Sequence, residues 1–267
     1  MRRRLAVLTS VPCLLAALAG PAFGISNGAP DGNTHPAIGM LLATNDSNNI
    51  CAGNHQFISS CSVTLIAPDL ALTHGNCTAA FRGGLDTGLV NEIWIIFDQD
   101  PFDNAISAFD CTKFTDVDET EIVTNPNPSL GVIRLAQPVS IPPVQLPIEN
   151  RLQNVPRGLD RLTSVAMGAT SATVGFDLRN TLRRSWLGRT DPPLEAEFHH
   201  VTLEEGGSPV QACFGASFTD GGAVFVEGTN EVVSLTQASS PCSPMGRLPR
   251  LDTPAARDFL DDYVTVP

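Results

Sequence analysis

The chain has 267 residues, of which 42% are hydrophobic and 16% charged, with 22 glycines and 21 prolines. This length can bury a large core, and the composition excludes a disordered chain and favours short strands joined by many turns. With 28 acidic and 16 basic residues the net charge is −12. That charge argues against nucleic acid and anionic membranes as partners.

The first 24 residues have the pattern of a secretory signal. Residues 2–4 are arginines, an apolar stretch covers 5–19, and small residues follow, with cleavage expected after Ala19 or Gly24. The apolar stretch is short for a membrane anchor. Removal of the segment leaves 13 basic and 28 acidic residues, a net charge of −15. We therefore expect a secreted protein, extracellular or periplasmic, that does not remain in a membrane.

Strand-like runs then recur at short intervals, separated by Gly, Pro and Asn. The expected strands are 36–44, 60–66, 70–73, 92–98 and 130–136 in the first half and 162–170, 183–188, 197–203, 222–227 and 231–236 in the second. Many short strands without helical patterns between them predict an all-β sandwich or barrel.

Two further segments complete the expected layout. The proline-rich stretch 138–147 is expected to form an extended connection between the halves. Residues 253–264 are expected to form a terminal helix, because Thr253 is a good N-cap and Pro254 suits the first helical turn.

Six cysteines follow the signal, and an even number in an exported chain argues for three disulfides. They are Cys51, Cys61, Cys77, Cys111, Cys213 and Cys242. Their spacing leaves all fifteen pairings open. The alternative of cysteine metal ligands lacks any C-x-x-C spacing.

Neither a metal nor a cofactor is expected elsewhere. The acidic run Asp116–Glu121 is either a calcium-binding loop or, as we favour, a solvated acidic loop, because it lacks a recognisable calcium signature. His199 and His200 would face opposite ways on a strand, which argues against a shared metal site.

Two stretches of sequence carry a family resemblance. Residues 61–78 read C-S-V-T-L-I-A-P-D-L-A-L-T-H-G-N-C-T, and residues 213–225 read C-F-G-A-S-F-T-D-G-G-A-V-F. Both resemble trypsin-like serine proteases, in which the corresponding motifs are C-S-G-T-L-I-x-P-x-x-x-L-T-A-A/G-H-C and C-x-G-D-S-G-G-P. Residues 25–34, I-S-N-G-A-P-D-G-N-T, resemble the mature N-terminus of bacterial members.

The resemblance spans about residues 25–265 and implies the fold. Trypsin-like proteases consist of two six-stranded Greek-key β-barrels and a C-terminal helix, with the substrate in the cleft between the barrels. The implied division is an N-terminal barrel over 25–145 and a C-terminal barrel with the helix over 146–267. The resemblance also implies the disulfides Cys61–Cys77 and Cys213–Cys242, with Cys51–Cys111 as the remaining pair.

The same resemblance assigns the catalytic positions, and none of them carries the expected residue without ambiguity. Asn76 stands where the family has its histidine, and Ser129 stands where it has its aspartate. Counted from Cys213, the nucleophile position falls on Ser217; counted back from the paired glycines 221–222, it falls on Asp220. We prefer Ser217, because that register keeps more identities.

These substitutions remove the chemistry that peptide hydrolysis needs. An asparagine amide cannot accept the proton of the nucleophile, and Ser129 brings no negative charge to a base. His74 is displaced from the base position by two residues, roughly 5–6 Å, and we expect it to be a solvated turn histidine. Ala216 replaces the aspartate that in the family binds the new N-terminus, here Ile25. By register, Gln211, Ser234 and Thr236 correspond to the specificity pocket.

We therefore expect a secreted, non-catalytic homologue of the trypsin-like proteases, a monomer that binds an unknown protein or peptide ligand. The alternative is an active trypsin-like endopeptidase that uses Ser217 with a rearranged base such as His74. A third hypothesis is a structural protein with no ligand in its cleft.

Overall fold

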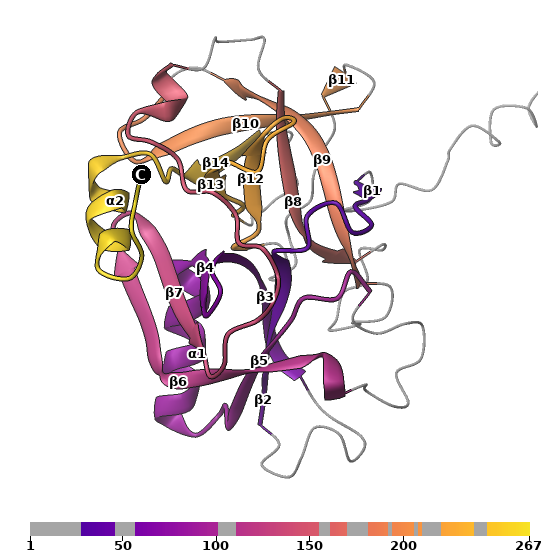
Figure 1. Ribbon diagram of the computed structural model, residues 1–267, viewed down its shortest axis with the longest axis vertical. Helices are drawn as coiled ribbons and strands as arrows, with labels where there is room; N and C mark the ends of the chain where they lie inside the picture. Colours follow the sequence, from indigo (N-terminus) through magenta and orange to yellow (C-terminus); the bar gives the residue numbers. More distant parts are fainter. Residues whose placement is uncertain are drawn as a thin grey trace, which may run out of the picture.

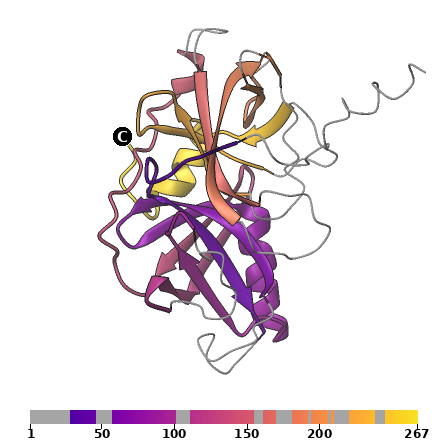
Figure 2. The ribbon, with the colours of Figure 1, turned by 90° about the vertical axis from the view of Figure 1, so that its right-hand side faces the viewer.

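The computed structural model describes residues 28–45, 57–100, 111–154, 161–169, 181–191, 194–205, 208–209, 220–237 and 245–267. Within these ranges the chain forms two packed β-barrels and two α-helices (Figure 1). Seen from the side, the first barrel lies below the second (Figure 2). The expected signal, residues 1–24, and Ile25 lie outside the described residues.

The first barrel is closed, in the order β2-β3-β4-β7-β6-β5, and each neighbouring pair is antiparallel. Its strands are β2 (Ile38–Thr44), β3 (Phe57–Ala67), β4 (Leu70–His74), β5 (Glu92–Ile96), β6 (Phe114–Pro126) and β7 (Ser129–Leu135). All five strands expected in this half are present. Strand β6 was not expected, because its acidic run interrupts the apolar pattern; those residues form a strand that bulges between Val117 and Ile122, and the prediction of a loop was wrong.

The second barrel is built from an eight-stranded sheet. Its strands are β1 (Ala29–Pro30), β8 (Arg161–Ala169), β9 (Thr181–Asp191), β10 (Phe198–Glu205), β11 (Ser208–Pro209), β12 (Ala223–Val226), β13 (Val232–Leu235) and β14 (Met245–Pro249). The five strands expected here are also present. The sheet curls until β14 meets β13, and there the two strands share a single bridge pair, Ser234 and Arg250.

The C-terminal helix forms where its caps predict it. Helix α2 (Pro254–Asp261) begins after Thr253, whose hydroxyl accepts a hydrogen bond from the Ala256 N–H at 3.2 Å. Ala256 and Leu260 are fully buried and pack into the core that fills the first barrel. The C-terminal helix is thus part of the contact between the two halves.

A second helix, α1 (Gly75–Thr87), follows β4 directly and was missed in the sequence. It packs against β7, because Gly131 leaves room for Thr78; a Cβ at position 131 would overlap the Thr78 side chain. The Thr78 hydroxyl then accepts a hydrogen bond from Thr124 of β6 at 2.7 Å. Asn76, which the family resemblance sets at the position of the catalytic histidine, therefore lies in the first turn of a helix.

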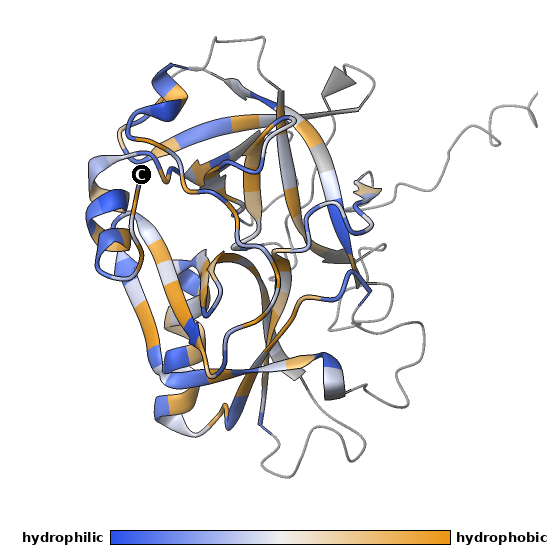
Figure 3. Ribbon diagram, in the orientation of Figure 1, coloured by the Kyte–Doolittle hydropathy of each residue, from blue (hydrophilic) through white to orange (hydrophobic). Residues whose placement is uncertain are grey.

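Hydrophobic residues gather on the strands of both barrels (Figure 3). The larger buried cluster fills the first barrel and continues through Phe225, Leu235 and Leu251 to the second half, whereas the cluster inside the second barrel is small. The buried Arg183 of β9 also joins the halves, since its Nε donates to the Ile38 carbonyl at 2.8 Å. In the described part of the chain, neither helix has the length and apolar character needed to cross a membrane.

Candidate functional site

The base position, Asn76, lies in the first turn of α1 and its side chain is exposed. Its backbone N–H donates to Nδ1 of His74 at 3.2 Å. A primary amide neither accepts a proton near neutral pH nor becomes charged. Asn76 therefore cannot act as the base that the sequence resemblance expects at this position.

Ser129, which the sequence resemblance sets at the position of the orienting carboxylate, lies beside Gly75, the residue before Asn76. It opens strand β7, and a Cβ placed on Gly75 would lie 2.8 Å from the Ser129 Oγ. The pairing of β4 with β7, which sets His74 opposite Leu130, brings these residues together. Two positions that the sequence resemblance assigned to the triad therefore lie close together, one carrying an amide and the other a hydroxyl.

Ser217, the preferred nucleophile position, lies outside the described residues, as do Gln211 and Ala216. Asp220, the alternative position, is described and buried. Its carbonyl oxygen accepts a hydrogen bond from the Ser62 N–H at 2.8 Å and lies 3.9 Å from the Cys77 Sγ. Asp220 is therefore adjacent to the residue that follows Asn76 in the chain.

The turn that carries Asp220 is held tightly against the first barrel. Gly221 has φ +90°, and a Cβ there would overlap the Thr73 hydroxyl and the Ser62 carbonyl oxygen. Its N–H donates to the Thr236 carbonyl at 2.9 Å, so the same residue also joins strand β13. Only glycine combines this positive φ with so close an approach.

His74 is not the solvated turn histidine that we expected. Its side chain is 1% exposed, and it is the N-cap of α1, with Nδ1 accepting from the Asn76 N–H. Burial lowers the pKa of His74 to about 4, although the Gln237 side chain, which faces the ring, raises it in part. Neither His74 Nε2 nor Gln237 Oε1 has a partner in good hydrogen-bond geometry within the described ranges. A ring that is buried, caps a helix and resists protonation is a poor general base.

One sequence signal could have revealed α1. Cys77, Phe81 and Leu85 recur every four residues, which is the spacing of one helical face, and Gly88 follows in a left-handed conformation with φ +71°. Two features hide this pattern: histidine is an unusual N-cap, and the paired glycines 83–84 are poor helix formers.

The two described residues expected at the specificity pocket are fully buried. Ser234 and Thr236 have 0% exposure, and Ser234 Oγ shares a 2.7 Å hydrogen bond with Nε2 of His199. Neither side chain is exposed to a ligand. The prediction that these two residues line the specificity pocket therefore does not put them on an open surface. His199 and His200 do face opposite ways, because His200 instead contacts Glu195 at 2.9 Å.

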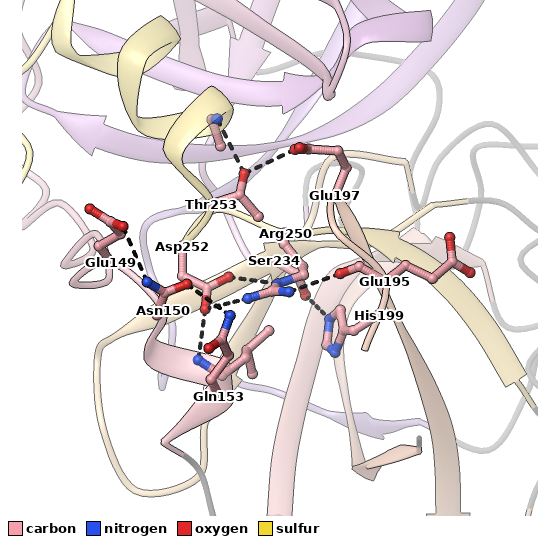
Figure 4. Close-up of polar contacts among 12 residues, drawn as sticks. Glu149, Asn150, Gln153, Glu195, Glu197, His199, Ser234, Arg250, Asp252 and Thr253 are labelled. Atoms are coloured by element: carbon pink, nitrogen blue, oxygen red, sulfur yellow. Dashed lines mark hydrogen bonds and ion pairs between the residues drawn. The ribbon is translucent and has the colours of Figure 1, made fainter. Parts of the chain in front are cut away.

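The contact between Ser234 and His199 resembles a nucleophile and its base, yet its surroundings make it structural. Figure 4 shows it beside a buried ion pair in which Arg250 donates to the two Asp252 oxygens at 2.8 and 3.0 Å. Burial, with the nearby charges of Arg250 and His200, lowers the pKa of His199 to about 3. A substrate cannot reach a pair that has no exposed surface.

The disulfide framework is confirmed at one of three bonds. Cys61 and Cys77 are joined at an S–S distance of 2.00 Å, which fixes the start of α1 to β3. Cys51, Cys213 and Cys242 lie outside the described residues, and the side chain of Cys111 is not described. The expected pairs Cys213–Cys242 and Cys51–Cys111 therefore stay predictions. Among the side chains described, no three His, Cys, Asp or Glu residues are grouped to hold a metal.

Comparison with known proteins bears on the fold. No protein-family model and no curated protein sequence match the chain. Among solved structures, the scabies mite inactivated protease paralogue S-I1 matches with a TM-score of 0.58 and 10% identity, over 89% of this chain and 98% of that one. The HL collagenase matches with a TM-score of 0.59 and 16% identity, over 89% and 97%.

The fold is that of the trypsin-like serine proteases. At these identities the likeness establishes the double-barrel architecture and nothing of the chemistry. One neighbour is named as an inactivated protease and the other as a collagenase. The fold therefore does not indicate whether a chain is catalytic. What this chain does must be argued from its own residues.

Proposed function

We propose that this chain is a secreted, non-catalytic homologue of the trypsin-like proteases that binds a protein or peptide ligand in the cleft between its barrels. The observation that carries the proposal is the absence of a base at the exposed position 76, together with the use of the adjacent imidazole, His74, as a buried helix cap. Peptide hydrolysis by this fold needs an imidazole in contact with a hydroxyl nucleophile and a carboxylate behind it.

Three features support the proposal beyond the base. Ser129 adjoins Gly75 and offers no charge to an imidazolium. Asp220, in one of the two registers, would place a carboxylate at the nucleophile position, where the family's chemistry needs a hydroxyl. The signal pattern in residues 1–24 and the Cys61–Cys77 disulfide support export.

A hydrolysis assay tests the catalytic half of the proposal. We expect the secreted chain to turn over a peptide ester no faster than buffer, and we expect the same of Asn76→His, because Ser129 still lacks a carboxylate. Turnover by the native chain would favour the alternative, an endopeptidase that uses Ser217 with His74. Turnover by Asn76→His alone would contradict the claim that the rest of the site is lost.

A binding assay tests the other half. The probe is a pool of fluorescein-labelled decapeptides with randomised central residues, followed by fluorescence anisotropy. We expect saturable binding that Asn76→Trp weakens at least about tenfold, since an indole there would fill the cleft edge. Ala80→Trp, on an exposed residue one helical turn further along α1, is the matched control and should bind like the native chain. No saturable binding, or equal binding by both variants, would overturn a ligand role for the cleft.

A further inference from the structure

The cap of helix α1 is a group that can titrate. The usual N-caps are Ser, Thr, Asp and Asn, which accept a backbone N–H without changing charge near neutral pH. Here the acceptor is Nδ1 of His74, whose backbone is extended at φ −72° and ψ 141°. The first turn of α1 holds no acidic residue that would replace the cap.

The cap fixes the tautomer of the ring. A nitrogen that accepts a hydrogen bond carries no hydrogen, so the neutral imidazole of His74 must carry its hydrogen on Nε2. That N–H faces the Gln237 side chain, which follows β13 in the second barrel, and Gln237 Oε1 is a buried acceptor without another partner in the described chain. The ring therefore caps α1 on the first barrel and faces a side chain of the second.

Few charged groups lie near the His74 ring to stabilise its protonated, positively charged form. His74 is 1% exposed, and the rest of β4 and the start of β7 carry no charged residue. The charged groups on the elements packed around it are Arg82 and Asp86 on later turns of α1, Asp69 before β4, Arg134 at the far end of β7, and Asp220. The effects resolved on its pKa are burial and Gln237, and burial dominates.

We propose that His74 is a pH-sensitive cap that holds the start of α1 and links it to the second barrel, and that its protonation releases this start. A proton on Nδ1 converts the acceptor into a donor directed at another donor, the Asn76 N–H. The opening is local, because the Cys61–Cys77 disulfide and the buried Phe81 still hold the helix on the barrel. The residue released is Asn76, so the cleft edge loosens in acid whether or not the cleft binds a ligand.

Amide hydrogen exchange tests this proposal on the full mature chain. We expect the protection factor of the Asn76 amide, corrected for the intrinsic rate, to fall by up to about tenfold per pH unit from pH 6.5 towards 4. His74→Asn keeps a capping acceptor that does not titrate, so its Asn76 protection should stay constant over that range. His199→Gln, in the core of the second barrel, should leave the native Asn76 profile unchanged.

Three results would overturn the proposal. The first is a native Asn76 protection factor that does not vary with pH, and the second is the same pH dependence in His74→Asn. The third needs no variant: an imidazole ¹⁵N spectrum at pH 7.5 in which His74 is the Nδ1–H tautomer or is doubly protonated. None of these readouts uses hydrolysis or ligand binding, so they fail or succeed independently of the function proposed above.

Discussion

The two barrels close in different ways. In the first barrel every neighbouring pair of strands shares a ladder, and even the shortest pairings, between β3 and β4 and between β5 and β6, each join three residue pairs. In the second barrel, the described residues join β13 to the end of β14 through one isolated bridge, between Ser234 and Arg250, which directly follows β14. Backbone hydrogen bonds do not depend on side-chain charge, so the ladders that close the first barrel do not require a charged side chain.

Side chains replace the missing ladder in the second barrel. Asp252 receives two hydrogen bonds from Arg250 and one from the Leu152 N–H at 2.7 Å, and His199 reaches Ser234 across the same seam (Figure 4). The seam also positions α2, because Thr253 directly follows Asp252. One fold can thus be closed either by backbone pairing or by a buried polar network, and only the network depends on charge state.

The largest effect should come from breaking that network. We expect Arg250→Met to lower the free energy of unfolding by about 3–5 kcal/mol, because it leaves the buried Asp252 carboxylate without its partner. Arg134→Met is the matched control in the first barrel. It removes a half-exposed ion pair with Asp69, formed at 2.7 Å, and should cost at most about 1 kcal/mol.

Urea unfolding of both variants measures the difference. Equal losses would contradict the contrast between the barrels. The double variant Arg250→Met/Asp252→Leu should lose less free energy of unfolding than Arg250→Met, because the second substitution removes the unpaired carboxylate. That result would attribute the loss to the buried charge.

The contact between the barrels should be the next most sensitive place. We expect Gly221→Ala to cost about 2–3 kcal/mol more than Gly228→Ala. Both glycines have positive φ, +90° and +74°, but a Cβ at 221 would overlap Thr73 and Ser62, whereas one at 228 meets nothing within 4 Å. The comparison of their urea midpoints therefore isolates the packing of the Asp220 turn on the first barrel. Similar costs would mean that this turn can move away without loss.

Acid should weaken the second barrel through His199. Its folded pKa, about 3, lies below the ordinary value of 6.5, so its contribution is complete above pH 6.5 and is lost as the pH falls from 6.5 towards 3. When the pH is lowered from 7 to 5, we expect the free energy of unfolding of the native chain to fall by on the order of 2 kcal/mol more than that of His199→Gln. Urea midpoints at the two pH values measure this. His200→Gln, next on the strand, should behave like the native chain; if it matched His199→Gln instead, burial would not be the cause.

The sequence predicted the parts of the fold that depend on neighbouring residues. All ten expected strands are present, as is α2, whose Thr253 and Pro254 are adjacent signals. The family resemblance correctly paired Cys61 with Cys77. Helix α1 was missed because its cap is the atypical His74 and glycines interrupt its apolar face.

The parts that could not be predicted join residues far apart in the chain. Ser234 and His199 are 35 residues apart, and Asp252 and Leu152 are 100 apart, so no local pattern indicates either contact. The role of His74 was misjudged for a similar reason, since it pairs with Leu130 of β7 and its ring faces Gln237, and both residues are far from it in the sequence.

The proposed function requires that no activated hydroxyl lies in the cleft between the barrels. Incubation of the native chain with a fluorophosphonate, followed by intact-mass measurement, tests it most directly, because this reagent reacts with a serine only when a base has activated it. We predict an unchanged mass under conditions in which trypsin is fully modified. A single stoichiometric adduct that peptide mapping assigns to Ser217 would contradict the account.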